Sequence, residues 1–219
     1  NDREDLLKEL YSEGIVAISS SSSIDSSKKN IEIAKGFENV YTNVGIHPHE
    51  AKNAPKNFED EIKTLLSFGK NVAIGEIGLD YHYDFSPRDV QKDVFIRQIE
   101  LAKSEKLPIV VHSRQAHEDT LKILKEHAIN KVPVLLHCFS GSLEMSRILR
   151  KLGVFISVGG VLTFQNAKKL VEVVKEYPLE LLMIETDAPY LTPHPHRGKR
   201  NDSTYLKYIV QKIAQIKEI

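Results

Sequence analysis

The chain has 219 residues, of which 41% are hydrophobic and 27% charged, a composition that excludes a disordered or fibrous protein and indicates a globular, soluble one. Lys plus Arg and Asp plus Glu both number 30, so the formal net charge of zero excludes a global field that attracts nucleic acid. Any polyanion must therefore be bound by a local group of cations. We interpret residues 1–219 as a single domain.

Features of secreted and membrane proteins are not found in the sequence. The single cysteine, Cys138, excludes an internal disulfide framework. No apolar run reaches the roughly 20 residues that a membrane-spanning helix needs, and the N-terminus lacks the regions of a signal peptide. We expect a cytoplasmic protein without membrane association, and we find no sign of an obligate protein partner.

Short apolar or β-branched runs alternate with helical patterns along the chain. A helix is predicted around Leu6, Leu7 and Leu10, ending near Gly14, and another over residues 88–106. The apolar runs are continuous, which is typical of parallel strands covered on both faces by helices. Seven strands are predicted, at residues 15–19, 40–46, 72–75, 108–112, 132–137, 154–158 and 181–185.

The number of elements distinguishes a closed barrel from an open sheet. Eight helical segments accompany seven strands, and one strand before Asn1 would complete eight β/α units. We therefore predict a TIM (β/α)8 barrel whose first strand is missing from the chain. The serine run at residues 19–23 falls in a loop after the first predicted strand, and we interpret it as a flexible polar turn.

Acids and histidines stand at the ends of four predicted strands. They are Glu76, His112, His137 and Asp187. In a TIM barrel these ends meet at one face, where the active site lies. Imidazole and carboxylate groups bind zinc, manganese or iron, and a carboxylate-rich site also accepts magnesium. The four residues together therefore predict a divalent metal site.

Each of these residues has a structural explanation when it is considered alone. A strand-end histidine is commonly a hydrogen-bonded core group, Glu76 could pair with an arginine, and Asp187 could cap the turn before Pro189. The combination favours the metal site, because four such groups in one barrel mouth would be costly to bury without a cation.

Two further groups of residues are candidates for substrate contact. His47 and His49 follow the second predicted strand and could be ligands, phosphate donors or groups behind the ligands, and we favour substrate contact. Arg197, Lys199 and Arg200 form a basic stretch in a proline-rich loop after Asp187. They could bind phosphate, although a solvated basic turn explains each of them equally well.

With these residues identified, the chain resembles the TatD family of metal-dependent deoxyribonucleases, within the amidohydrolase-like TIM barrels. The resemblance covers the whole chain. It rests on the motifs VGIHPH (44–49), GEIGLDY (75–81), QKDVF (91–95) with Gln98, LPIVVH (107–112), HCFSG (137–141), GG (159–160), ETDAPY (185–190) and RGKRN (197–201).

This resemblance implies two divalent metal ions, with Mg²⁺ or Mn²⁺ favoured over Zn²⁺. Glu76 would bridge both ions, His112 and His137 would hold one, and Asp187 would help to hold the other and act as the catalytic base. The second ion would also need an H-x-H pair on the first strand, before Asn1, and the family's final helix would follow the last residue. We expect the chain to be incomplete rather than a degraded relative of the family.

The implied activity is hydrolysis of phosphodiester bonds in DNA, in the 3′ to 5′ direction, on single strands or at ends. Two alternatives remain open: a metal hydrolase of a small amide, lactone or phosphotriester, and a non-catalytic barrel that binds nucleic acid or a protein partner. Aromatic residues make up only 7% of the chain, without tryptophan, so the sequence indicates no base-stacking platform.

Overall fold

The computed structural model describes residues 2–219, in which eight α-helices alternate with seven strands. The chain divides into two compact units, residues 1–134 and 135–219. The first element is a helix, α1, so the strand predicted before Asn1 is not among the described residues. No helix in residues 2–219 combines the length and hydrophobicity that a bilayer crossing requires.

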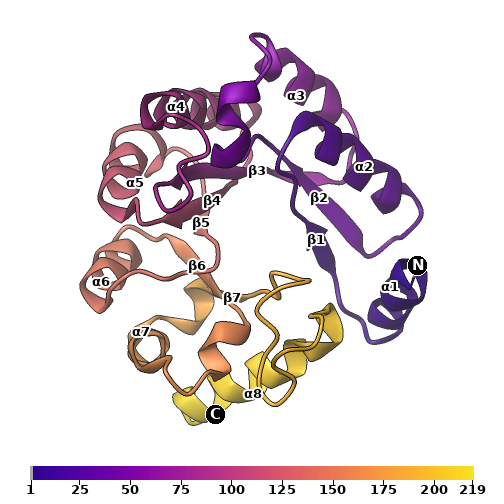
Figure 1. Ribbon diagram of the computed structural model, residues 1–219, viewed down its shortest axis with the longest axis vertical. Coiled ribbons are helices and arrows are strands. Elements are labelled where there is room, and N and C mark those ends of the chain that lie inside the picture. The colour runs from indigo at the N-terminus through magenta and orange to yellow at the C-terminus, as the bar shows by residue number, and fades with distance from the viewer. Residues whose placement is uncertain (1) are drawn as a thin grey trace. The chain divides into compact units, whose positions relative to one another are not determined.

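The first unit contains four parallel strands flanked by helices (Figure 1). Its strands are β1 (Ala17–Ser19), β2 (Val40–Val44), β3 (Asn71–Asp80) and β4 (Ile109–Arg114). Its helices are α1 (Arg3–Ser12), α2 (Ile24–Lys35), η1 (Pro48–Asn53), α3 (Phe58–Leu66), α4 (Arg88–Glu105), α5 (His117–Ile123) and η2 (Leu124–Ala128).

Apolar residues of β3, β4 and α4 form much of the core of this unit. Ile77 and Leu79 of β3 and Ile109 of β4 are fully buried, as are Phe95 and Ile99 on the inner face of α4. Burying one such side chain stabilises the fold by about 1.5–3 kcal/mol. The helix predicted at residues 88–106 thus packs its apolar stripe on the sheet, as its spacing indicates.

The second unit continues the alternation with parallel strands and shorter helices. Its elements are β5 (Val134–Leu136), α6 (Leu143–Lys151), β6 (Phe155–Val158), η3 (Gly160–Thr163), α7 (Lys168–Glu176), η4 (Leu179–Leu181), β7 (Leu182–Ile184), η5 (Ser203–Tyr205) and α8 (Leu206–Lys217). Its core joins Val158, Leu162 and Val174 to Ile209 and Ile213 of α8.

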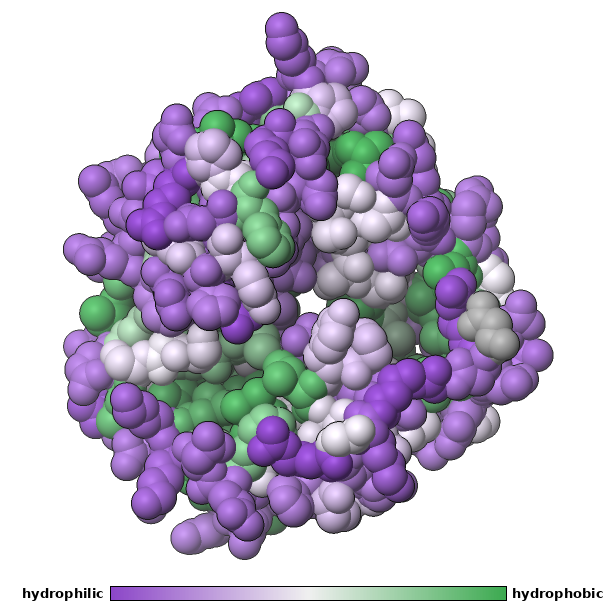
Figure 2. Space-filling model, in the orientation of Figure 1, coloured by the Kyte–Doolittle hydropathy of each residue, from purple (hydrophilic) through white to green (hydrophobic). Residues whose placement is uncertain are grey.

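The face of the molecule in Figure 2 is mostly hydrophilic, with hydrophobic residues gathered over β6 and β7. Met183 and Ile184 of β7 belong to the exposed hydrophobic residues of the second unit. In the first unit, Val16 and Ile18 at β1 are likewise exposed. Apolar side chains on these two strands are therefore less covered than those of the central strands.

Candidate metal centre

Three ligand-type side chains of the first unit meet near the carboxyl-terminal halves of its central strands. His47 follows β2, Glu76 lies within β3, and His112 lies in β4. One carboxylate oxygen of Glu76, Oε1, is 3.0 Å from His112 Nδ1 and 3.4 Å from His47 Nε2. The ligand atoms of the three residues lie within 4.8 Å of one another. Parallel strands place their ends together, which explains why residues so far apart in sequence converge.

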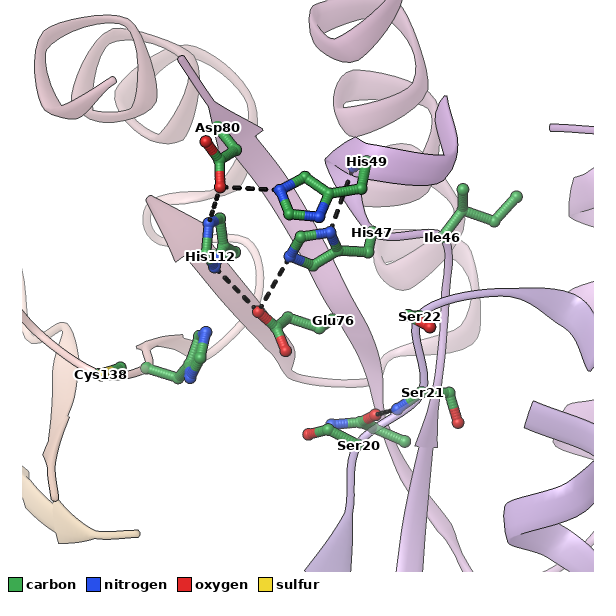
Figure 3. A network of polar contacts seen from close by, with 12 residues as sticks. Ser20, Ser21, Ser22, Ile46, His47, His49, Glu76, Asp80, His112 and Cys138 are labelled. Carbon is green, nitrogen blue, oxygen red and sulfur yellow. Dashed lines mark hydrogen bonds and ion pairs between the residues drawn. The ribbon is translucent and has the colours of Figure 1, made fainter. Parts of the chain in front are cut away.

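Asp80, at the end of β3, ties this cluster to a second histidine. Its Oδ2 lies 3.0 Å from His112 Nε2 and 2.9 Å from His49 Nε2. In Figure 3 the side chains of His47, His49, Glu76, Asp80 and His112 point toward one another. The Asp80 carboxylate therefore fixes the ring orientation of His112, as a carboxylate behind a metal-ligating histidine does.

The charges of the cluster favour a form that can bind metal. Burial is the largest influence on His47 and lowers its pKa, although the neighbouring Glu76 partly offsets this. Neutral imidazole is the metal-binding form. Burial alone would raise the pKa of Asp80, but hydrogen bonds from His112, the backbone of Tyr83 and His49 outweigh it and hold this pKa well below its usual range. Asp80 thus stays ionised beside the two histidines.

The serine run after β1 is part of this arrangement. The backbone oxygen of Ser21 accepts a hydrogen bond from Glu76 N at 2.9 Å, and that of Ser22 accepts one from His47 N at 3.0 Å. Ser21 is itself buried, and its backbone N donates to Asn43 Oδ1 at 2.9 Å. The interpretation of this run as a flexible polar turn is wrong, because its backbone carbonyls hold two residues of the cluster.

Two buried glutamines on α4 hold the backbone on which the histidines and Asp80 stand. Gln98 accepts from Ile46 N at 2.7 Å and donates to Ile46 O at 3.0 Å. Gln91 accepts from Asp80 N at 2.9 Å and donates to Ser86 O at 2.8 Å. They are seven residues apart, two helical turns, so both face the sheet.

Replacing Gln98 by alanine is expected to lower the free energy of unfolding by about 2–4 kcal/mol, because the buried N–H and C=O of Ile46 would lose their partner. Urea denaturation followed by circular dichroism measures this change. Gln211→Ala, on the exposed face of α8, is the matched control and should differ from the parent by less than about 0.5 kcal/mol. Equal stability of the two variants would contradict the positioning role of Gln98.

Replacing Asp80 by asparagine is expected to weaken Mn²⁺ binding by about 10- to 100-fold, because His112 would lose the charge that orients its ring. Isothermal titration calorimetry of the purified chain measures the affinity. Asp60→Asn, on the exposed side of α3, should bind Mn²⁺ as the parent does. An unchanged affinity in Asp80→Asn would show that the carboxylate does not support the site.

The second unit holds its own histidine–carboxylate group. His137 Nδ1 lies 3.6 Å from Glu185 Oε2, the same oxygen that accepts hydrogen bonds from Cys138 N at 3.0 Å and from the hydroxyl of Ser157. Burial raises the pKa of Glu185, but the bonds from His137, Ser157 and Cys138 outweigh burial and lower it. Glu185 Oε1 is buried without a hydrogen-bond partner among the described residues.

Asp187 lies in an exposed loop that a buried asparagine fastens. Asn201 donates from Nδ2 to Thr186 O at 2.7 Å and to Tyr190 O at 2.6 Å, on both sides of Asp187. Asp187 itself adopts a positive φ of 55°, a conformation that asparagine and aspartate tolerate better than most residues. The RGKRN motif thus positions the ETDAPY loop as well as carrying cations.

The three predicted cations of this loop are exposed, but they are not equivalent. The Arg197 guanidinium lies 3.8 Å from the ring centroid of Phe164 and lines a pocket of about 280 Å³ with Gln165, Asn166 and His194. A cation–π contact leaves the guanidinium edge available to an anion. Lys199 contributes its backbone carbonyl to the loop, accepting from the Thr192 hydroxyl at 2.5 Å.

The structure thus brings together His47, Glu76 and His112 from the predicted set. His49 is connected to this cluster through Asp80, whose carboxylate contacts both His49 and His112. His137, Asp187 and the cations belong to the second unit. Sequence reasoning assigned no role to Asp80, Glu185 or Asn201, although all three stand inside the quoted motifs. The feature that could have identified these three residues is that each is a polar residue in an otherwise apolar or turn-forming motif.

The donor set of the first unit fits a divalent metal. It offers two imidazoles and one carboxylate, the ligands of many catalytic sites. Glu76 and His112 are only partly buried, so a position for water or substrate remains accessible. The carboxylate behind His112 completes the arrangement that metal-ligating histidines show.

Comparison with known proteins gives a consistent result. The chain is 49% identical over 189 residues to the uncharacterized metal-dependent hydrolase YabD of Bacillus subtilis, covering 86% of this chain and 74% of YabD. It is 37% identical over 182 residues to the uncharacterized metal-dependent hydrolase YcfH of Escherichia coli K12, covering 83% of this chain and 68% of YcfH.

Solved structures match over nearly the whole chain. The TatD homologue YJJV of Escherichia coli K12 has a TM-score of 0.90 at 28% identity, covering 98% of this chain and 84% of that one. A TatD-family hydrolase of Entamoeba histolytica has a TM-score of 0.87 at 28% identity, covering 100% of this chain and 83% of that one. These likenesses confirm the predicted α/β fold of the TIM-barrel type.

The fold, the histidine–carboxylate cluster and these relatives together define a metal-dependent hydrolase. The family model described as TatD-related DNase matches residues 1–219. The chain belongs to this family, as the motifs predict.

Proposed function

We propose that this TatD-family hydrolase cleaves phosphodiester bonds in DNA, one nucleotide at a time from the 3′ end of a single strand. The observation that carries the proposal is the cluster of His47, Glu76 and His112, whose ligand atoms lie within 4.8 Å of one another. The family description as a DNase supports the substrate. The exposed cations after Asp187 support binding of a polyanion by a chain without net charge.

In this proposal two divalent ions are bound, with Mg²⁺ or Mn²⁺ favoured over Zn²⁺. Their ligands are Glu76 and His112 of the first unit and His137 and Asp187 of the second. The assignment across the two units rests on the family pattern. When bound, such ions lower the pKa of a water molecule and stabilise negative charge on a phosphate. Asp80 supports the proposal, since its carboxylate orients His112.

The remaining roles belong to side chains of this chain. Asp187 is exposed in its fastened loop, where its carboxylate accepts the proton of the attacking water. Arg197, Lys199 and Arg200 hold the non-bridging oxygens of the phosphate. His49, bonded to Asp80, and His47 contact the substrate from the first unit, and His47 is also close enough to Glu76 to act as a ligand.

The proposal is tested with 5′-end-labelled single-stranded DNA and metal-stripped protein, with and without added Mg²⁺ or Mn²⁺. A ladder that shortens from the 3′ end only when metal is added is the expected result. Turnover should fall steeply with salt, and more gently in the triple variant Arg197→Gln, Lys199→Gln, Arg200→Gln, because fewer phosphate contacts release fewer counterions.

Two outcomes would overturn the proposal. Salt-insensitive hydrolysis of a neutral ester or lactone, with DNA left intact, would assign the metal centre to a small substrate. Tight metal binding with no hydrolysis of any ester would make the chain a binding protein.

A further inference from the structure

Two exposed aromatic rings stand beside the metal cluster on the loop that follows β3. Tyr83 is 47% exposed and Phe85 is 53% exposed. Their ring centroids are 5.2 Å apart with an interplanar angle of 24°, so the rings are stacked. We define the Tyr83–Phe85 pair as the aromatic platform. The low aromatic content of the sequence gave no indication of such a surface, because two well-placed rings suffice to form it.

The aromatic platform is held in place by the same buried groups that hold the cluster. Asp80 Oδ1 accepts hydrogen bonds from the backbone N of His82 and of Tyr83, both at 2.9 Å. At the other end of the loop the Ser86 hydroxyl donates to His49 O at 3.0 Å, and Gln91 donates to Ser86 O at 2.8 Å. The loop is therefore ordered before any ligand binds, which reduces the entropic cost of binding.

One imidazole ring separates the aromatic platform from the metal cluster. The His49 ring makes T-shaped contacts with both rings, with centroids 5.3 Å from Tyr83 and 4.9 Å from Phe85. His49 Nε2 lies 2.9 Å from Asp80 Oδ2, and the same oxygen lies 3.0 Å from His112. A ligand that reaches the cluster with one group can therefore cover the platform with a neighbouring group.

The charge beside the aromatic platform indicates which ligand fits. The guanidinium of Arg114, an exposed residue at the end of β4, lies 4.8 Å from the Tyr83 ring centroid. A flat apolar surface, a flanking cation and a nearby candidate metal cluster match a nucleotide, which offers a base and an anionic backbone together. A membrane or a hydrophobic peptide would not need the cation.

We propose that the aromatic platform stacks the base of an unpaired nucleotide next to the phosphate that is cleaved. This inference rests on the proposed function for its substrate and adds the reason for a preference for single strands. Base stacking on aromatic side chains is tolerant of sequence, because every base has a π face. Bases inside a duplex are already stacked, so their faces are not available to Tyr83 and Phe85.

The test compares Phe85→Ala with the parent chain in binding and in cleavage of short DNA strands. Binding is measured by fluorescence anisotropy with a dye-labelled thymidine oligonucleotide and with a strand of equal charge that is abasic in its last positions at the 3′ end. Phe85→Ala is expected to weaken binding of the normal strand by about 5- to 100-fold and to leave the abasic strand unchanged. KM for the normal strand should rise by a similar factor while kcat changes little.

Three further variants make the result specific. Phe85→Trp should restore binding, because it restores a stacking surface, and Tyr83→Ala should weaken binding as Phe85→Ala does. Tyr11→Ala removes an exposed ring on α1 and should bind both strands as the parent does. Thermal melting of each variant checks the fold, which substitutions at these half-exposed positions should leave intact.

The outcomes separate this inference from the proposed function. Equal binding of both strands by Phe85→Ala and the parent, or no binding by the parent, would overturn the aromatic platform, whether or not DNA is cleaved. Binding that depends on Phe85 without metal-dependent cleavage would support the platform and contradict the nuclease.

Discussion

Replacing Glu76 by glutamine is expected to lower metal-dependent hydrolysis by at least about 10³-fold, because several kcal/mol of metal-derived stabilisation of the transition state depend on this carboxylate. Glu76 Oε1 faces both His112 and His47, at 3.0 Å and 3.4 Å, so the substitution removes the only negative charge among the three clustered ligand-type residues. The measurement is kcat/KM at saturating Mn²⁺, with DNA as substrate.

Glu118→Gln is the matched control for this prediction. Glu118 is exposed on α5, and its substitution changes the net charge by the same amount. The control should keep the kcat/KM of the parent, and both variants should melt within a few degrees of it. If Glu76→Gln retained more than about a tenth of the parent activity, the carboxylate could not be a metal ligand in the reaction.

Replacing Gly78 by alanine is expected to destabilise the first unit by about 3–5 kcal/mol. Gly78 has a φ of +134°, and a Cβ there would lie 2.1 Å from the backbone oxygen of His112. Backbone cannot move aside as a flexible side chain does, so β3 and β4 would separate where Gly78 pairs with His112. Urea denaturation measures the loss in stability.

Gly69→Ala serves as the control for Gly78→Ala. A Cβ at Gly69 would meet nothing within 4 Å, so its stability should match the parent within about 0.5 kcal/mol. A Cβ at Gly78 would press on the backbone of His112. The fraction of Gly78→Ala that still folds should therefore also bind Mn²⁺ more weakly. A fully stable Gly78→Ala with unchanged metal binding would contradict the close approach of the two strands.

Most of the fold followed from the hydrophobic pattern. The helix predicted at residues 88–106 matches α4 (Arg88–Glu105), and each predicted strand overlaps an observed one. The main difference is β3, which extends to Asp80 where the prediction ended at residue 75. Glu76 and Gly78 interrupt the apolar pattern, because one faces the metal cluster and the other makes room for the His112 backbone.

The site was predictable only in part, for a physical reason. The predicted strand ends identified Glu76 and His112, although β3 and β4 continue past these residues to Asp80 and Arg114. Neighbouring parallel strands still bring the two side chains together. The roles of Asp80 and Gln98 depend on hydrogen bonds to residues 32 and 52 positions away, which periodicity along the chain does not encode. The serine loop was misinterpreted for the same reason, because its backbone carbonyls and side chains bond to residues distant in the sequence, among them His47, Glu76 and Asn43.

The most direct test of the metal centre is anomalous diffraction from crystals of this chain soaked in MnCl₂. A peak about 2.0–2.3 Å from Glu76 and from a ring nitrogen of His112 is expected, with Asp80 still bonded to the other nitrogen of that ring. Manganese bound elsewhere, with the cluster of His47, Glu76 and His112 left empty and its hydrogen bonds unchanged, would contradict the assignment of this cluster as the metal centre.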